Sequence, residues 1–248
     1  MGKLEGKVAV VTGGTSGIGL AAAQRFVEEG ARVFLMGRHA AKLKAAVARL
    51  GPAAIGVQGD VASLQDLARL FATVQARAGR IDVLLTCAGG VQFAALGAIT
   101  EQHFNVLFDV HVKGTLFTVQ GALPLLSDGA SVILMASSAA STGTPGCSVY
   151  SAGKAAVRNF ARSWLLDLRS RHVRVNVLSP GPTRTEGLVA LAPPEHAQRM
   201  ISALAARVPM GRVGLPQEVA DVAVFLASAD STFVNGIELA VDGGMAQI

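Results

Sequence analysis

Residues 8–19 decide the fold of this chain, and they read Val8-Ala9-Val10-Val11-Thr12-Gly13-Gly14-Thr15-Ser16-Gly17-Ile18-Gly19. The run of four apolar residues predicts a short strand that is buried on both faces. The glycines that follow allow a sharp turn, and the spacing of the next apolar residues predicts a helix. Leu20, Ala23, Phe26 and Val27 share one face of that helix. The stretch therefore predicts a β-strand, a glycine-rich turn and an α-helix in direct succession.

The same alternation continues along the rest of the chain. Further short apolar runs predict strands at 33–36, 54–57, 83–85, 132–135, 173–177 and 237–240. The segments between them have helical spacing, and no linker, repeat or low-complexity tract interrupts the series. Strands that alternate with helices predict a parallel sheet covered on both faces. We therefore expect an α/β fold, with one domain over residues 1–248 and a doubly wound, seven-stranded parallel sheet.

The glycine-rich turn has the composition of a phosphate-binding turn. Glycine lets a pyrophosphate approach the amides at the N-terminus of the following helix, where the helix dipole favours negative charge. The position of the turn, directly after the first strand, strengthens this interpretation. A merely tight connection between strand and helix is the alternative. We expect a dinucleotide to contact Gly13, Thr15, Ser16, Gly17, Ile18 and Gly19.

The end of the second predicted strand, Met36-Gly37-Arg38-His39, favours one of the two nicotinamide dinucleotides. NAD sites place an acidic residue there, about 20 residues after the turn, to bind the ribose 2′-hydroxyl. This stretch has no acid, and the planar guanidinium of Arg38 can bind a 2′-phosphate. We therefore expect NADP(H) to be preferred over NAD(H), with Arg38 and His39 among the cofactor contacts. An ordinary solvated charge at a helix start is the alternative for Arg38.

A tyrosine and a lysine lie one turn apart at the start of a later amphipathic helix. Tyr150 and Lys154 share one helix face because four positions separate them. An ammonium beside a phenol lowers the phenol pKa from about 10, which makes the phenol a usable acid or base near neutral pH. Ser137 ends the preceding strand run, at the edge where parallel strands form a ligand crevice. By itself, a Tyr-x-x-x-Lys pair is common by chance.

Together with the glycine-rich turn, these residues closely resemble the short-chain dehydrogenase/reductase family. The resemblance runs from Lys7 to Gly244. The matching motifs are Thr12–Gly19, Asp60-Val61, Ala88-Gly89, Ser137, Tyr150 with Lys154, Asn176–Pro182 and Val241-Asp242-Gly243-Gly244. The resemblance implies a Rossmann fold and an NADP(H)-dependent oxidoreductase that interconverts a ketone or aldehyde and its alcohol. It also implies a homotetramer built through the long fourth and fifth helices and the C-terminal strand.

The resemblance further implies a role for each motif. Tyr150 is implied as the acid/base, Lys154 as the group that lowers its pKa and holds the nicotinamide ribose, and Ser137 as the partner of the substrate oxygen. Ser137 rather than Ser138 has the usual family separation of thirteen positions from Tyr150. The remaining implied cofactor contacts are Asp60 and Val61 at the adenine, Ala88 and Gly89 on the adenosine ribose side, and Pro180, Gly181 and Thr183 at the nicotinamide end.

Two positions depart from the family pattern. The family often has Asn-Asn-Ala-Gly where this chain has Thr86-Cys87-Ala88-Gly89, and we expect Cys87 to be a small packed residue rather than a reactive thiol. His111 stands where the family usually has an asparagine that is thought to maintain a water-linked proton path to the lysine. His111 is thus a fourth catalytic candidate, because its ordinary pKa of about 6.5 suits a proton relay. It could also be protonated beside Lys154, or simply pack.

A proline-rich segment at about 182–212 follows the sixth predicted strand, and we interpret it as a mobile lid over the site. A surface excursion without a role is the alternative. The lid residues Leu188, Val189 and Leu191, together with mainly small residues at 89–92 and 138–145, predict a neutral or hydrophobic small-molecule substrate. Two other functions remain open. One is a 3-ketoacyl reductase, and the other is a dinucleotide-binding sensor or scaffold that has lost catalysis.

The composition limits the remaining partners. The net charge of +5 is scattered without a basic run interleaved with aromatics, so we expect no nucleic-acid partner. The sequence shows neither a charged-then-apolar leader nor an apolar stretch of about 18 residues, so we expect a soluble protein without a membrane span. Cys87 and Cys147 form neither a disulfide framework nor a CxxC pair. We expect a reduced, cytoplasmic protein without a metal site.

Overall fold

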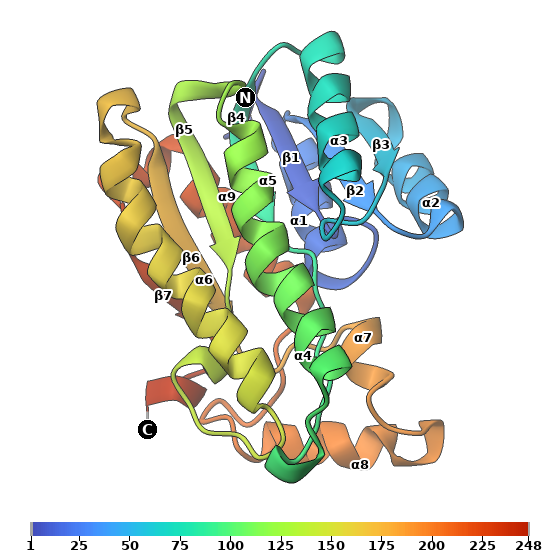
Figure 1. Cartoon of the computed structure of the whole chain (residues 1–248). Coiled ribbons are helices and arrows are strands. Elements are labelled where there is room, and N and C mark those ends of the chain that lie inside the picture. The colour runs from blue at the N-terminus through green and yellow to red at the C-terminus, as the bar shows by residue number, and fades with distance from the viewer. Residues whose placement is uncertain (1, 248) are drawn as a thin grey trace.

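The computed structural model describes residues 2–247, which build one seven-stranded parallel sheet with helices on both faces (Figure 1). The strands are β1 Val8–Thr12, β2 Arg32–Gly37, β3 Ala54–Gln58, β4 Ile81–Thr86, β5 Leu126–Met135, β6 Arg174–Pro180 and β7 Glu238–Val241. The helices are α1 Gly17–Glu28, α2 Ala40–Leu50, α3 Leu64–Arg77, α4 Glu101–Phe108, α5 Gly114–Ala122, α6 Ser148–Asp167, α7 Glu186–Val189, α8 Pro194–Ala205 and α9 Pro216–Ala227. The strand order β3-β2-β1-β4-β5-β6-β7, parallel throughout, confirms the predicted doubly wound sheet.

The direction in which the chain crosses the sheet reverses between β1 and β4. From β1 the chain winds outward to β2 and β3, and from β4 it winds the other way to β7. β1 and β4 are neighbours, and Thr12 at the end of β1 pairs with Thr86 at the end of β4. Their connections leave toward opposite sides, so a crevice opens beyond the carboxyl ends of the two strands. The predicted site segments follow the carboxyl ends of β1, β4, β5 and β6.

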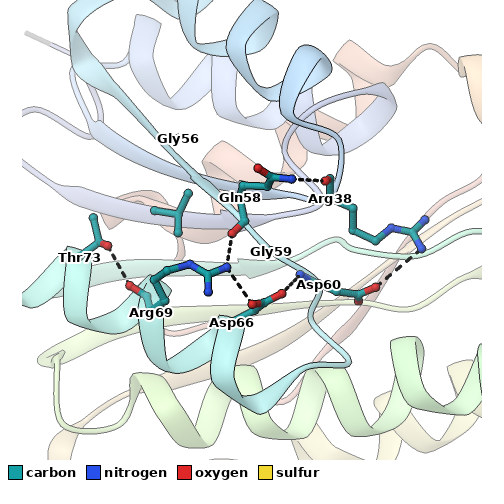
Figure 2. A pocket seen from close by; sticks show the side chains of 9 residues that line it. Arg38, Gly56, Gln58, Gly59, Asp60, Asp66, Arg69 and Thr73 are labelled. Atoms are coloured by element: carbon teal, nitrogen blue, oxygen red, sulfur yellow. Dashed lines mark hydrogen bonds and ion pairs between the residues drawn. The ribbon is translucent and has the colours of Figure 1, made fainter.

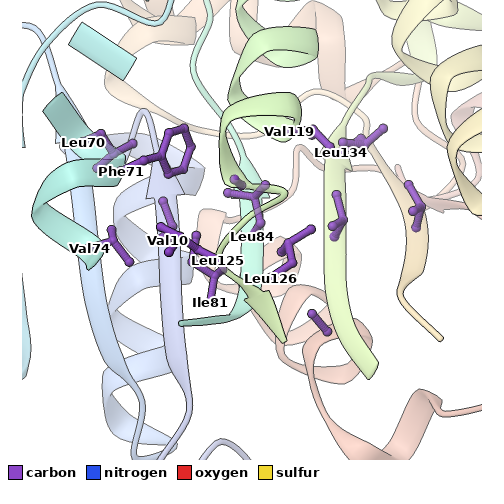
Figure 3. Packing of buried hydrophobic residues seen from close by; sticks show 14 of the residues in the cluster. Val10, Leu70, Phe71, Val74, Ile81, Leu84, Val119, Leu125, Leu126 and Leu134 are labelled. Carbon is purple, nitrogen blue, oxygen red and sulfur yellow. The ribbon is translucent and has the colours of Figure 1, made fainter. Parts of the chain in front are cut away.

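Each face of the sheet is covered by its own set of helices. α3, α5 and α6 cover one face, where Leu70 and Val119 pack against the strands (Figure 3). Val157 of α6 belongs to the same buried cluster. α1, α2 and α9 cover the other face through residues such as Phe26 and Ala223. Successive side chains of a strand point to opposite faces of the sheet. Because both faces are covered, β1 is buried along its whole length.

Two segments differ from the simple sequence pattern. β5 begins at Leu126 rather than near Val132, because its early part contains the exposed residues Asp128 and Gly129 and its register with β4 shifts beside Ile81. Between α4 and α5 the chain forms a π-helical turn, Asp109–Lys113. Within residues 2–247, no helix is both long and apolar enough to cross a membrane.

Candidate active site

The glycine-rich turn joins β1 to α1 in conformations that require glycine. Gly13 and Gly17 have φ values of 68° and 53°, in the region that strains other residues. A Cβ at Gly13 would lie 2.6 Å from the Ala88 Cα, and a Cβ at Gly19 would lie 2.2 Å from the Gly13 carbonyl oxygen. The Ser16 side chain does not cap the amides of α1. The turn therefore offers a close backbone cradle at a helix N-terminus, which fits the pyrophosphate of a dinucleotide.

The turn also reaches the end of β2. A Cβ at Gly37 would lie 2.4 Å from the Thr15 Cγ2, so the Thr15 side chain occupies the space that glycine leaves at this strand end. Ile18 points the other way and packs against the core beneath α1. The predicted contacts Thr15 and Arg38 therefore lie at one edge of the sheet, whereas the side chain of Ile18 packs against the core.

Arg38 lines an open cavity of about 580 Å³ between the end of β2, the edge strand β3 and α3 (Figure 2). A second guanidinium there, that of Arg69, is engaged: its Nη2 donates to the Gln58 carbonyl at 2.6 Å and to Asp66 Oδ1 at 2.8 Å. The Arg38 side chain is 64% exposed, and its one ion pair within residues 2–247 is a long one, 3.8 Å from Nη1 to Asp60 Oδ2. Arg38 is therefore the cation at this edge that can turn toward an anionic ligand.

The two residues expected at the adenine differ in what their side chains do. The Asp60 carboxylate faces the cavity, and the backbone amide of Asp60 donates to Asp66 Oδ2 at 2.8 Å. Val61 is buried and packs against Gly114, where a Cβ would lie 2.8 Å from the Val61 Cγ2. The Val61 side chain therefore packs in the core. His39 is exposed and stands immediately before α2.

Ser137, Tyr150 and Lys154 meet at the carboxyl edge of β5. Ser137 follows β5, and Tyr150 and Lys154 lie in the first turns of α6. The Ser137 hydroxyl hydrogen-bonds the Tyr150 phenol. The Lys154 Nζ lies 5.7 Å from the Tyr150 ring centroid and donates to the Met135 carbonyl at 2.8 Å. The structure therefore brings the three residues together as the sequence predicts, with the Met135 carbonyl as a further partner that no sequence pattern indicated.

The pKa values in this cluster are set chiefly by burial. Burial lowers the pKa of Lys154 to about 8. Burial also raises the pKa of Tyr150, and the hydrogen bond with Ser137 acts in the opposite direction. The lowering of the tyrosine pKa by Lys154 stays a prediction, because in this arrangement the Lys154 ammonium donates to the Met135 carbonyl. At neutral pH the pair is a charged lysine beside a protonated phenol.

His111 lies inside the π-helical turn, next to this cluster. It is 2% exposed, and its ring meets the Tyr150 ring edge-on with centroids 5.3 Å apart. Burial, together with the charge of Lys154, lowers the pKa of His111 to about 3. The possibility of a protonated His111 beside Lys154 is therefore wrong, and the imidazole is neutral.

Cys87 follows β4 and packs against the core on the α1 side of the sheet. Burial raises the pKa of its thiol to about 11, so the thiol stays protonated and unreactive at neutral pH. This confirms the expectation of a packed cysteine. The neighbouring Ala88 is half-buried directly across from Gly13 of the glycine-rich turn, and Gly89 after it is exposed.

The segment after β6 closes the crevice on the remaining side. The Thr183 hydroxyl donates to the Gly181 carbonyl at 3.0 Å, and Pro180 and Thr183 are buried. Beyond them, the Thr185 side chain lies against Gly17, where a Cβ would be 3.1 Å from the Thr185 Cγ2. The segment predicted as a lid therefore starts at the phosphate-binding turn and continues through α7 and α8 below the sheet in the view of Figure 1.

An apolar arm after β4 completes the rim. Residues 89–100 contain no charged side chain, and Phe93 and Leu96 in this arm are 54% and 85% exposed. The Ala94 amide donates to the Gly146 carbonyl at 2.9 Å, which ties the arm to the loop before α6. The sequence reasoning stopped at Gln92 and missed this arm. An uncharged stretch with two large apolar residues was the signal that could have found it.

The whole chain is similar to known oxidoreductases. A family model described as Enoyl-(Acyl carrier protein) reductase matches residues 13–246. The chain is 48% identical to the oxidoreductase asL5 of Sarocladium schorii, over 99% of this chain and 98% of that relative. It is 36% identical to the NADP-dependent (R)-specific alcohol dehydrogenase of Lentilactobacillus kefiri, over 98% of this chain and 97% of that relative.

Solved structures agree with the sequence relatives. The structure of a Brucella melitensis protein described as a short-chain dehydrogenase/reductase and glucose/ribitol dehydrogenase superposes with a TM-score of 0.93, at 29% identity and 99% coverage of both chains. A mutant of a Serratia marcescens short-chain dehydrogenase/reductase superposes with a TM-score of 0.92, at 27% identity, covering 98% of this chain and 99% of that one. The chain belongs to the short-chain dehydrogenase/reductase family, whose members are oxidoreductases that use a nicotinamide cofactor on small molecules.

Proposed function

We propose that this protein is an NADP(H)-dependent oxidoreductase that interconverts a ketone or aldehyde and its alcohol. The observation that carries the proposal is the cluster of Ser137, Tyr150 and Lys154 at the carboxyl edge of β5, beside the glycine-rich turn after β1. A nicotinamide, when bound, supplies or accepts the hydride. The chain itself has to bind the cofactor, orient the carbonyl and move one proton.

In the direction of reduction, Tyr150 is the proton donor. As hydride adds to the carbonyl carbon, the carbon–oxygen π pair moves onto the oxygen, and that oxygen takes the phenol proton of Tyr150. Ser137 hydrogen-bonds the same oxygen and polarises it. The charge of Lys154 stabilises the resulting phenolate once the side chain turns from the Met135 carbonyl toward the phenol. Oxidation of the alcohol runs through the same groups in reverse.

The preference for NADP(H) rests on the edge of the sheet beyond β2. Arg38 is exposed and held only by the long ion pair with Asp60, so a 2′-phosphate can replace that carboxylate as its partner. The Lentilactobacillus kefiri relative, described as NADP-dependent, is consistent with this reading. Of the other expected contacts, Asp60 lines the same cavity as Arg38, whereas Ala88, Gly89, Gly181 and Thr183 follow the carboxyl ends of β4 and β6; we assign these residues to the rest of the cofactor.

The substrate that this rim favours is neutral and apolar. Neither the arm at 89–100 nor the loop at 138–147 contains a charged side chain, and both carry small or apolar residues. The segment at about 182–212, with Leu188 and Val189 half-buried above the crevice, is proposed as the lid that excludes water from the site. A ketone or aldehyde with an apolar substituent matches these walls.

A 3-ketoacyl reductase is a second candidate. The matching family model is described by chemistry on acyl carrier protein, which favours an acyl thioester substrate. Against this candidate, the two uncharged walls offer nothing to an acidic carrier. A cofactor-binding sensor without turnover is the third candidate function. It is supported by His111, which stands in place of the family asparagine.

We also propose a homotetramer. Phe104 and Val106 on α4 are each 43% exposed, Leu166 on α6 is 60% exposed, and Phe233 before β7 is fully exposed. Large apolar side chains at such positions are typical of surfaces that pair with a second copy. Val157 and Ala161 of α6 and Leu107 and Val119 of α4 and α5 are instead core residues and take no part in this surface.

The test is a substrate and cofactor panel on the purified protein. Oxidation of NADPH and of NADH is followed with aldehydes, ketones and a 3-ketoacyl thioester, for the wild type and for Arg38→Gln. We expect turnover of apolar ketones or aldehydes with NADPH, and an NADPH KM that rises roughly tenfold in Arg38→Gln while the NADH KM stays unchanged. Preference for the thioester would select the 3-ketoacyl reductase. Cofactor binding without turnover on any substrate would contradict the proposal and favour the sensor.

A further inference from the structure

His111 occupies a distinctive place in the backbone. The turn Asp109–Lys113 is π-helical, whereas the residues on either side of it belong to the ordinary helices α4 and α5. Such single-turn insertions shift side chains around the helix axis and recur at functional sites. Here the inserted turn carries His111, which it directs away from solvent. This placement brings the ring to the floor of the crevice.

The hydrogen bond of His111 fixes its tautomer. The Nε2 lies 2.8 Å from the Gly90 carbonyl oxygen. A carbonyl oxygen only accepts, and the imidazole is neutral, so Nε2 carries the single ring proton and donates it. Nδ1 is then the unprotonated nitrogen, and it is buried without a protein partner within residues 2–247. The ring is therefore held by one directed bond to the segment after β4.

The same ring occupies the space beside Gly89. A Cβ at Gly89 would lie 2.2 Å from the His111 Cε1 and 2.7 Å from Nδ1. Only glycine at position 89 therefore allows the ring to lie where it does. Gly89 and the Gly90 carbonyl thus contact one side of the imidazole, by packing and by a hydrogen bond. This segment is the one expected against the ribose of the cofactor.

The other side of His111 faces α6. Its ring meets the Tyr150 ring edge-on, at an interplanar angle of 83° and a centroid distance of 5.3 Å. The His111 Cβ lies 3.6 Å from where a Cβ of Gly153 would be, so the backbone of α6 is also close. One imidazole therefore contacts both the floor segment Gly89–Gly90 and the tyrosine that we propose as proton donor.

We propose that His111 is a positioning residue: as a neutral imidazole that donates from Nε2 to the Gly90 carbonyl, it holds the Gly89–Gly90 segment in place against Tyr150. The held segment supports the cofactor, and the ring contact keeps the phenol in its place relative to that segment. The inference rests on the proposed function, which names Tyr150 as the proton donor. It differs from a proton relay, because the bond to Gly90 uses the only proton on the ring.

The experiment compares two substitutions at this position. In His111→Gln, the amide nitrogen of glutamine can take the place of Nε2 and still donate to the Gly90 carbonyl. His111→Leu fills similar space but leaves that buried carbonyl without its donor. His103→Leu, in the preceding helix α4, serves as the control for removing a histidine away from the crevice. The readouts are the Kd for NADPH by fluorescence titration, and kcat and KM on the best carbonyl substrate.

We expect His111→Leu to raise the NADPH Kd and to lower kcat by roughly tenfold each, as one lost hydrogen bond to a buried group predicts. His111→Gln should restore both to within about threefold of the wild type, and His103→Leu should change neither. Wild-type values in His111→Leu would overturn the proposal. An equal loss in both His111 variants would overturn it too, because the donated bond would then not be the cause.

The two readouts separate this inference from the proposed function. If the wild-type protein binds NADPH but turns over no substrate, the proposed function fails, and the Kd comparison still decides the role of His111 on the cofactor segment. If His111→Leu does not fold, His111→Gln decides alone. An unchanged Kd then supports the donated bond, and a tenfold higher Kd overturns it.

Discussion

At the scale of single residues, Lys154 holds a positive charge where water has little access. The residue is 5% exposed, and its ammonium has the Met135 carbonyl as a hydrogen-bond partner, with no carboxylate paired to it among residues 2–247. Burial lowers its pKa from 10.5 to about 8, so folding has to desolvate a charge at neutral pH. The proposed role of this charge in the chemistry of Tyr150 accounts for the cost. The charge of Lys154 therefore lowers the stability of the fold while it supports the proposed chemistry.

Replacing Lys154 with methionine should stabilise the fold while removing activity. Because the folded pKa lies below the unfolded value, the penalty is complete below about pH 8 and disappears as the pH rises toward 10.5. We expect Lys154→Met to raise the free energy of unfolding by about 1–3 kcal/mol near neutral pH, and by much less at about pH 10. Urea unfolding of both proteins at the two pH values measures the difference. A less stable variant near neutral pH would show that the ammonium stabilises the fold.

The residue identities of the site were largely predictable, and their environments were not. Tyr150, Lys154 and Ser137 meet as their spacing and strand-end position indicated. The raised pKa of Tyr150 was not foreseen, because it depends chiefly on burial in the folded chain. The bond from His111 to Gly90 joins residues that are 21 positions apart, and no local pattern encodes it.

At the scale of elements, the turn after β1 and the segment after β4 approach each other backbone to backbone. The missing Cβ of Gly13 allows this approach, since that atom would lie 2.6 Å from the Ala88 Cα and 2.7 Å from the Ala88 nitrogen. Neither neighbour is a flexible side chain that could move aside. The contact joins the two strands between which the sheet reverses its winding, so it shapes the crevice directly.

Gly13→Ala should therefore cost more than its backbone conformation alone explains. Gly129 is a matched control, because its φ of 76° resembles the 68° of Gly13 while no atom lies within 4 Å of its missing Cβ. We expect Gly129→Ala to lower the free energy of unfolding by about 1 kcal/mol, and Gly13→Ala by about 2–4 kcal/mol with loss of cofactor binding. Urea unfolding and NADPH titration test both variants. Equal losses in the two would contradict a backbone clash at Gly13.

The strands and most helices were predictable because their apolar periodicity is strong. β1 and α1 lie where the sequence of residues 8–19 predicts a strand and a following helix. The early part of β5 was missed because its exposed polar residues interrupt the apolar run that periodicity detects. The π-helical turn was missed because the residues Asp109–Lys113 differ in no visible way from those of an ordinary helix.

At the scale of the whole molecule, the surface of α4 carries apolar side chains that the core does not use. Phe104 and Phe108 stack with ring centroids 4.2 Å apart, and Phe104 and Val106 remain 43% exposed. α4 and α6 lie beside each other on the same side of the sheet (Figure 1), and α6 adds the exposed Leu166. Sequence reasoning expected an interface on these helices. The sequence alone does not separate the buried residues of such a helix from its exposed ones: on α6, Val157 is buried whereas Leu166 is exposed.

A charge at Phe104 should break one of the proposed subunit interfaces. We expect the wild-type protein to be a tetramer in light scattering, and Phe104→Arg to give smaller species with secondary structure intact, because a buried unpaired guanidinium is costly. Leu64→Arg, at a 51% exposed position on α3, is the control and should leave the tetramer unchanged. A monomeric wild type, or an unaffected Phe104→Arg tetramer, would contradict the assignment of this surface.

The central claim is that Tyr150 donates the proton in an NADPH-dependent carbonyl reduction, and one comparison tests it most directly. The measurement is kcat for NADPH oxidation on the best carbonyl substrate, for the wild type and for Tyr150→Phe, with the NADPH Kd determined for both. We predict that kcat falls roughly 10²–10⁴-fold in Tyr150→Phe while the NADPH Kd changes less than about threefold, because only the proton donor is removed. Turnover at the wild-type rate in Tyr150→Phe would contradict the account.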